Sequence, residues 1–318
     1  MRYVIFGPAI VALSALMQTT AAGKGIDLDS REYKIMLEEE HFGGGAPEHS
    51  VDRFVRDQLE PAVRRNFGGG AADELASKSL DLDERRLVRF WDTETCALIN
   101  HGFALRDRVD LGAADRPATK GEITLKFRSP DLFLAADMRL DAFAEADHPE
   151  SKLEEDIGAL AVRIAAEEAI VAVPRSSRSQ FSRSTKQKID SDAMPRTLNE
   201  VEELYPKLEE NLRLVGGEID MSAALTPGPE YRELVYESSK LDLAGDTKAK
   251  FALTIWYQGA ANRDAPALAE VSFSYDTDDG AVPAEAARRA HDLLLAMQDL
   301  EWADPAVPTK TALVGCVD

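Results

Sequence analysis

The sequence has few cysteines and few histidines. Cys96 and Cys316 are its two cysteines, and five histidines occur in 318 residues. A structural zinc site needs four ligands, and these residues show no such spacing. Nor do they form a Ser-His-Asp or Cys-His arrangement typical of nucleophilic hydrolases. The two thiols could form a disulfide in an oxidising compartment or remain unpaired, because so long a separation in sequence carries no geometric information.

Basic residues are scarce relative to acidic ones. The chain has 37 lysines and arginines against 57 aspartates and glutamates, a formal net charge of −20. Nucleic acids and anionic membranes attract proteins whose lysines and arginines cluster over the surface. The composition therefore argues against a nonspecific binder of either, and any anion site must be local.

Long apolar runs are missing outside the first residues. An apolar stretch from Tyr3 to Met17 follows Arg2 and ends in small residues up to Ala22. It is shorter than the roughly 20 residues that span a bilayer, so it predicts a signal peptide over residues 1–22 rather than a membrane anchor. We expect the mature chain, residues 23–318, to be a single periplasmic or secreted domain without a membrane partner.

Short strand-like segments separated by turns make up most of the remaining sequence. Strands are expected at 31–42, 85–93, 103–109, 122–129, 151–160, 231–243, 248–258 and 267–276, and helices at 50–67, 199–212 and 283–300. Pro61 should kink or divide the first helix, and Gly102 should close a short helical turn after residue 93. We predict an α+β fold in which about eight antiparallel strands form a strongly curved sheet or closed barrel, with helices outside it.

Charged residues alternate with apolar ones along several of these strands. Side chains that are two residues apart share a face of a strand. The shared faces carry Arg106 with Arg108, Lys126 with Arg128, Glu32 with Lys34, Lys152 with Glu154 and Asp156, and Glu270 with Ser272 and Ser274. On an open sheet these faces would meet water. Inside a barrel, they would form a site for a polyanion and a hard divalent cation.

A serine-rich basic run follows residue 174. It contains Arg175, Arg178, Arg183, Lys186 and Lys188 without an intervening acid. The run is either an exposed basic loop or a strand that contributes cations to the same anion site.

The stretch "RFWDTETCALINHGFALRDRV...GEITLKFRS" resembles the CYTH superfamily, the triphosphate tunnel metalloenzymes. Its order matches a strand ending in Asp-Thr, a short helix, a glycine, a Leu-Arg-x-Arg strand and a Thr-Leu-Lys strand. The segments "REYK", "KLEED" and "AEVSF" fit more loosely. The resemblance implies an eight-stranded antiparallel tunnel that binds a small phosphorylated anion of the triphosphate type with Mg²⁺ or Mn²⁺.

The resemblance also implies roles for individual residues. It places Arg106, Arg108, Lys126, Arg128 and Arg183 on the substrate, Glu32, Lys34 and Glu154 in catalysis, and Glu32, Glu154, Asp156 and Glu270 on the metal. Ser30 stands where the family's first signature glutamate is expected. The prediction is a metal-dependent hydrolase of tripolyphosphate or a small organic triphosphate. The alternatives are a polyphosphate-binding protein with a degenerate metal site, and an exposed charged sheet that serves as a partner surface.

Overall fold

The structure is a computed structural model that describes residues 26–45, 47–164, 169–216, 219–259, 265–277 and 281–304, together with Lys310 and Cys316. The expected signal peptide, residues 1–22, lies outside the described residues. Among the helices described, none is both long and apolar enough to span a membrane.

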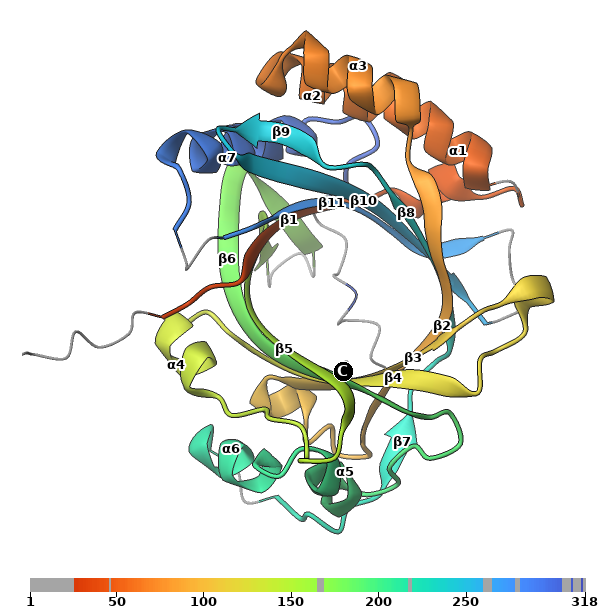
Figure 1. Cartoon of the computed structure of the whole chain (residues 1–318), viewed down its shortest axis with the longest axis vertical. Helices are drawn as coiled ribbons and strands as arrows, with labels where there is room; N and C mark the ends of the chain where they lie inside the picture. The colour runs from red at the N-terminus through yellow and green to blue at the C-terminus, as the bar shows by residue number, and fades with distance from the viewer. Residues whose placement is uncertain are drawn as a thin grey trace, which may run out of the picture.

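The described strands form a closed barrel (Figure 1). Its closure depends on the pairing of β10 with β11, which joins the two ends of the sheet. Two short strands lie outside the ring, β7 (Leu225–Pro227) beside β2 and β9 (Leu241–Ala244) beside β10. In order around the barrel the strands are β11 (Pro266–Asp276), β1 (Ser30–Leu37), β5 (Asp147–Ile164), β6 (Ala169–Asp190), β4 (Lys120–Ser129), β3 (Phe103–Asp110), β2 (Asp81–Thr93), β8 (Tyr231–Glu237) and β10 (Thr247–Gln258).

The closed barrel confirms the predicted architecture, but the strand count and directions differ from the prediction. Nine described strands form the ring instead of eight, and the pairing of β1 with β5 is parallel. Chain direction reverses at each antiparallel junction, so a closed ring needs an even number of such junctions. Nine strands therefore require at least one parallel pair. This pair places Glu32 of β1 directly beside Asp156 of β5.

Helices cover the outside of the barrel on two sides (Figure 1). On one side lie α1 (Pro47–Phe54), α2 (Glu60–Phe67), α3 (Gly69–Lys78) and α7 (Ala284–Gln298). On the other lie α4 (Leu132–Asp137), α5 (Leu198–Leu204) and α6 (Leu208–Leu214). The helix expected over 50–67 runs without a break through a π-helical segment, Val55–Leu59, into α2, and Pro61 follows that segment.

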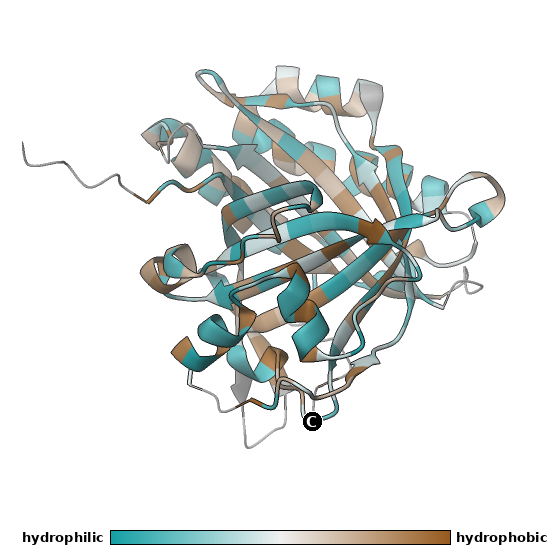
Figure 2. Cartoon of the chain, turned by 60° about the horizontal axis from the view of Figure 1, so that its bottom comes forward, coloured by the Kyte–Doolittle hydropathy of each residue, from teal (hydrophilic) through white to brown (hydrophobic). Residues whose placement is uncertain are grey.

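Most apolar residues of the strands face outward and pack under these helices, while a smaller apolar cluster that includes Met36, Phe90 and Trp256 shares the inner face. Phe251 and Phe273 belong to a buried cluster with α2 and α7, and Phe103 and Phe127 to another with α5 and α6. Hydrophilic and hydrophobic residues are interspersed along the strands seen in Figure 2. Because side chains alternate across a strand, packing the apolar set outside places the polar set inside the barrel.

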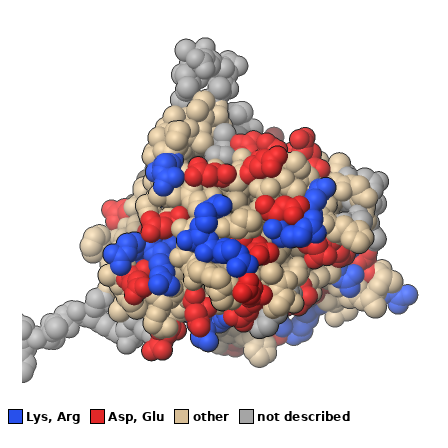
Figure 3. All heavy atoms as spheres, turned by 90° about the horizontal axis from the view of Figure 1, so that it is seen from above, with Lys and Arg blue, Asp and Glu red and all other residues tan. Residues whose placement is uncertain are grey.

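The exterior carries charges of both signs. On the face shown in Figure 3, basic and acidic side chains are interspersed, and no continuous basic patch covers it. Cations are therefore not concentrated on this face of the molecule.

Cys96 and Cys316 form a disulfide with their Cα atoms 5.7 Å apart. This decides between the two alternatives that the sequence left open. Cys316 also packs against an apolar cluster that includes Met36, Phe90 and Trp256.

Replacing Cys316 with serine is expected to lower the free energy of unfolding by about 2–4 kcal/mol, because the bond closes a very long loop in the unfolded chain. Urea unfolding of oxidised protein would measure this loss. Under dithiothreitol the two proteins should unfold alike. A variant as stable as the oxidised parent would contradict the prediction.

Candidate functional site

A short turn between β2 and β3 aligns the basic strands of the barrel. The Asp92 carboxylate accepts hydrogen bonds from the backbone N–H groups of Thr93 (2.7 Å), Leu98 (2.8 Å) and Ile99 (2.9 Å). Gly102 then takes a left-handed conformation with φ of 81°. A Cβ atom there would lie 2.9 Å from the carbonyl oxygen of Arg128, so only glycine lets β3 approach β4 this closely. The expected helical closure at Gly102 is confirmed.

Five inward-facing residues form a lysine–carboxylate cluster inside the barrel. They are Glu32 and Lys34 of β1, Lys126 of β4, and Glu154 and Asp156 of β5. Lys34 Nζ lies 2.7 Å from Glu32 Oε2 and 2.9 Å from Asp156 Oδ1. Lys126 Nζ lies 3.5 Å from Asp156 Oδ2 and 3.6 Å from Glu154 Oε2. Asp156 therefore bridges two ammonium groups.

The cluster favours the charged forms of Lys34 and Asp156. Burial opposes the charge of Lys34, but Asp156 and Glu32 outweigh burial and hold its pKa well above the usual range. Burial also opposes the charge of Asp156, but Lys126 and Lys34 lower its pKa well below the usual range. These opposite shifts show that the paired charges stabilise one another in the barrel.

Ser30 takes part in the same cluster. Its hydroxyl donates a hydrogen bond to Glu154 Oε1 at 3.1 Å. A serine stands where the family resemblance predicts a carboxylate, so the residue here orients a neighbouring carboxylate and adds no negative charge.

Two arginines, Arg86 and Arg108, contact a buried glutamate on the adjoining part of the barrel wall. Glu233 of β8 has a side chain that is 1% exposed, and its Oε2 lies 2.6 Å from Arg86 Nε and 3.5 Å from Arg108 Nε. Trp256 Nε1 donates to Glu233 Oε1 at 3.0 Å. Burial opposes the charge of Glu233, but Arg108 and Arg86 hold its pKa well below the usual range.

Arg86 and Glu233 were not among the site residues predicted from the sequence. The available signal was the period-two spacing that puts Arg86 on one strand face with Val88 and Phe90, and Glu233 on one face with Tyr231. The neighbouring residues are too mixed in polarity for that signal to stand out.

Two arginines of the barrel lack a carboxylate partner within the described part of the chain. Neither Arg106 of β3 nor Arg128 of β4 forms an ion pair there, and Arg106 Nε is buried without a hydrogen-bond partner. Burial, Arg108 and Arg86 together lower the pKa of Arg106 well below its usual range. Burial and Arg128 likewise lower the pKa of Lys126, despite Asp156. This side of the barrel carries positive charge that its own carboxylates do not neutralise.

Glu270 of β11 is buried at the same end of the barrel as Trp256, with a side chain that is 4% exposed. Its Oε1 lies 2.7 Å from Lys310 Nζ, and that ammonium lies 5.9 Å from the centre of the Trp256 ring. Burial opposes the charge of Lys34, and Glu270 helps Asp156 and Glu32 to raise its pKa. Lys310 carried no signal in the sequence.

Arg183 does not join the residues predicted with it. In β6 it pairs with Phe127, whose side chain lies outside the barrel, while its neighbours Ser182 and Ser184 pair with Arg128 and Lys126. Its Nη2 donates to the backbone oxygen of Ala136 at the helical side, 3.3 Å away. The expectation placed Arg183 in the tunnel, and strand alternation turns it to the opposite face.

The basic run around Arg183 is a strand rather than a loop. It lies within β6. Lys186 Nζ lies 3.6 Å from Glu122 Oε2 and 3.1 Å from Glu150 Oε2. Arg175 is on the outside of the barrel, and its Nη1 lies 3.3 Å from Asp299 Oδ2. Only part of the run therefore contributes to the inner face.

The donor set of the lysine–carboxylate cluster suits a hard divalent cation. Among the described residues, no group of three or more histidines, cysteines, aspartates or glutamates is arranged to hold a metal. However, Mg²⁺ in phosphoryl-transfer sites is usually held by one or two carboxylates together with substrate phosphates. Glu32 and Asp156, adjacent across the parallel pair, supply two such carboxylates. Both carboxylates are ion-paired with Lys34 in this structure, and a cation would replace that ammonium group.

No protein-family model matches the chain, and no curated protein sequence matches it. Three solved structures are similar along most of their length. A Hippeastrum protein, described as a putative adenylyl cyclase with a dominant triphosphatase activity, is 13% identical, covering 90% of this chain and 95% of that one with a TM-score of 0.35. A putative adenylate cyclase from Bacillus halodurans is 12% identical, with 90% and 94% covered and a TM-score of 0.38. A Pyrococcus horikoshii protein is 9% identical, with 87% and 93% covered and a TM-score of 0.29.

The barrel brings the basic pairs of β3 and β4 and the carboxylates of β1 and β5 onto one inner surface. The closed barrel agrees with the tunnel architecture that the CYTH resemblance of the sequence implies. The function of this barrel has to be argued from its own inner residues.

Proposed function

We propose that the CYTH-like barrel binds and hydrolyses a triphosphate-like anion, either inorganic tripolyphosphate or a small organic triphosphate, with Mg²⁺ or Mn²⁺. The observation that carries the proposal is the positive charge of Arg106 and Arg128, which have no carboxylate partner in the described part of the chain. A buried charge without a partner is costly. A polyanion in the barrel would neutralise both guanidinium groups.

The basic residues of β3 and β4 would bind the phosphoryl oxygens. Guanidinium groups hold phosphate through paired N–H donors, and an ammonium group acts as a point charge. Arg106, Arg108, Lys126 and Arg128 extend from two adjacent strands, so they line one continuous wall. Since burial disfavours the charge of Arg106 and Lys126, a bound anion raises the pKa of both groups and gains affinity from doing so.

The carboxylates on β1 and β5 would hold the cation. Glu32 and Asp156, with Glu154 and Glu270 as further carboxylates, would hold a divalent ion, which would supply Lewis-acid activation of an attacking water. Lys34 exchanges its carboxylate partners for phosphate oxygens as substrate enters. Glu154, which contacts Ser30 and Lys126, would orient the water.

A second candidate function is binding without hydrolysis. Ser30 removes one carboxylate from the expected set, and Lys34, Lys126 and Lys310 pair with the carboxylates that remain. These pairs compete with a metal ion. The barrel would then hold polyphosphate as a binding protein.

Phosphate release from tripolyphosphate tests both functions. We expect the purified mature chain to release phosphate with Mg²⁺ or Mn²⁺ and to stop when EDTA is added. Thermal stabilisation by tripolyphosphate without release would support the binding protein instead. Neither release nor stabilisation would contradict both functions.

We further propose that the mature chain is exported to the periplasm or secreted. The Cys96–Cys316 disulfide supports this, because such bonds persist in oxidising compartments. Export favours inorganic tripolyphosphate over nucleotides as the substrate. Mass spectrometry of the protein isolated from its native compartment should show an N-terminus at residue 23.

A further inference from the structure

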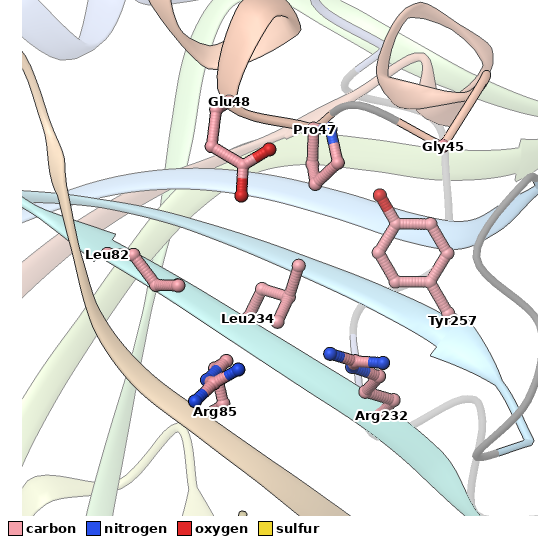
Figure 4. Close-up of a pocket in the computed structure, with 8 residues that line it drawn as sticks. All are labelled: Gly45, Pro47, Glu48, Leu82, Arg85, Arg232, Leu234 and Tyr257. Carbon is pink, nitrogen blue, oxygen red and sulfur yellow. The ribbon is translucent and has the colours of Figure 1, made fainter. Parts of the chain in front are cut away.

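A pocket with both charged and apolar lining residues lies on the outside of the barrel wall. It has a volume of about 180 Å³ and is lined by Glu48 at the start of α1, Leu82 and Arg85 of β2, Arg232 and Leu234 of β8, and Tyr257 of β10 (Figure 4). Arg232 neighbours Glu233 in sequence, and Glu233 faces the interior with Arg86 and Arg108. Strand alternation therefore separates this pocket from the tunnel.

Arg232 is buried in this pocket with unused hydrogen-bond donors. The residue is 6% exposed, and its Nη2 donates to Asp115 Oδ1 at 3.1 Å. Its Nε and Nη1 are buried and have no hydrogen-bond partner in the described part of the chain. Buried guanidinium donors are rarely left unpaired, so a ligand with acceptor oxygens would complete the site. Arg85 Nη1, 3.5 Å from Asp115 Oδ1, adds a second cation to this side.

The opposite side of the pocket accepts hydrogen bonds. Figure 4 shows the Glu48 carboxylate across the pocket from the two guanidinium groups, with Leu234 between them. Tyr257 donates its hydroxyl proton to the backbone oxygen of Phe42 at 3.2 Å, which leaves its oxygen free to accept. Burial and Glu48 raise the pKa of Tyr257 to about 12, so this hydroxyl stays protonated at neutral pH.

We propose that this pocket binds a free α-amino acid with an aliphatic side chain. The guanidinium groups of Arg232 and Arg85 bind the α-carboxylate, and Glu48 with Tyr257 binds the α-ammonium group. Leu82 and Leu234 contact the aliphatic side chain. A phosphate dianion would satisfy the guanidinium groups but would be repelled by Glu48. A simple carboxylic acid would leave Glu48 without a partner.

Isothermal titration calorimetry with L-leucine and three matched probes tests the assignment. The probes are 4-methylpentanoate, which lacks the ammonium group, 3-methylbutylamine, which lacks the carboxylate, and inorganic phosphate. Leucine should bind about tenfold or more tightly than each probe, because each probe loses one charge-assisted interaction. Failure of leucine to bind, or tighter binding of phosphate to this pocket, would overturn the proposal.

Three single-residue variants test whether leucine binds in this pocket. Glu48 is exposed, so Glu48→Gln should fold normally, weaken leucine about tenfold and abolish the preference over 4-methylpentanoate. Arg85→Gln should weaken both acids. The tunnel variant Arg106→Ala should leave leucine affinity unchanged, so loss of phosphohydrolase activity and loss of leucine binding are separate outcomes. A Glu48→Gln protein that still prefers leucine over 4-methylpentanoate would also overturn the assignment.

Discussion

Replacing Arg106 with alanine is expected to reduce kcat/KM for tripolyphosphate by about 100-fold or more, the usual effect of removing one donor that stabilises developing charge. The affinity for tripolyphosphate should fall with it. The free protein should keep its free energy of unfolding to within about 1 kcal/mol, because Arg106 forms no ion pair in the described part of the chain and burial disfavours its charge. Loss of function without loss of stability is the result that marks a ligand-binding cation.

Arg175→Ala is the matched control for this prediction. Arg175 is also an arginine on a barrel strand, but its side chain is 63% exposed and pairs with Asp299 on the exterior. Phosphate-release kinetics and urea unfolding should show little change in this control. Equal losses of activity in the two variants would place the anion site elsewhere.

Replacing Asp156 with asparagine is expected to lower the free energy of unfolding by about 3 kcal/mol and to abolish stimulation by Mn²⁺, because removing one partner of a buried ion pair leaves uncompensated charge. Two ammonium groups, those of Lys34 and Lys126, lose this partner. The Asp156 side chain is only 11% exposed, so water compensates little.

The effect of Asp156→Asn should depend on pH. The pKa of Asp156 is lowered in the folded protein, so its carboxylate stabilises the fold above the unfolded-state pKa of about 4 and loses that effect as the pH falls through the folded value. Urea unfolding of both proteins should therefore show the largest difference near neutral pH and a shrinking one in acid. A difference that does not change with pH would contradict the assigned pairing.

A double variant that keeps the net charge, Asp156→Asn with Lys34→Met, separates the effect of ion pairing on stability from the effect of packing. Adding Lys34→Met to Asp156→Asn removes one of the two cations that lose Asp156 as a partner and should restore part of the lost stability. Glu150→Gln is the control, since its partners Lys152 and Lys186 are largely exposed and such pairs contribute at most about 1 kcal/mol. Equal destabilisation by Glu150→Gln and Asp156→Asn would show that burial of the pair has no special effect.

Local alternation in the sequence predicted which residues share a strand face. Arg106 lies with Arg108, Lys126 with Arg128, and Glu154 with Asp156, as their spacing requires. The barrel was predictable for the same reason, because many short alternating strands with turns between them must bury one face. The number of strands was not predictable, because closing the ring constrains the directions of all strands together. No single sequence segment carries that information.

The sequence by itself therefore determined the pairs, because side-chain direction in a strand depends only on neighbouring residues. Tertiary structure alone decided which pairs meet. It placed β1 parallel to β5, turned Arg183 outward, brought Glu233 to Arg86, and joined Cys96 to Cys316 across a separation of 220 residues. These contacts depend on how distant strands close the ring and which face the helices cover, and both are properties of the whole chain.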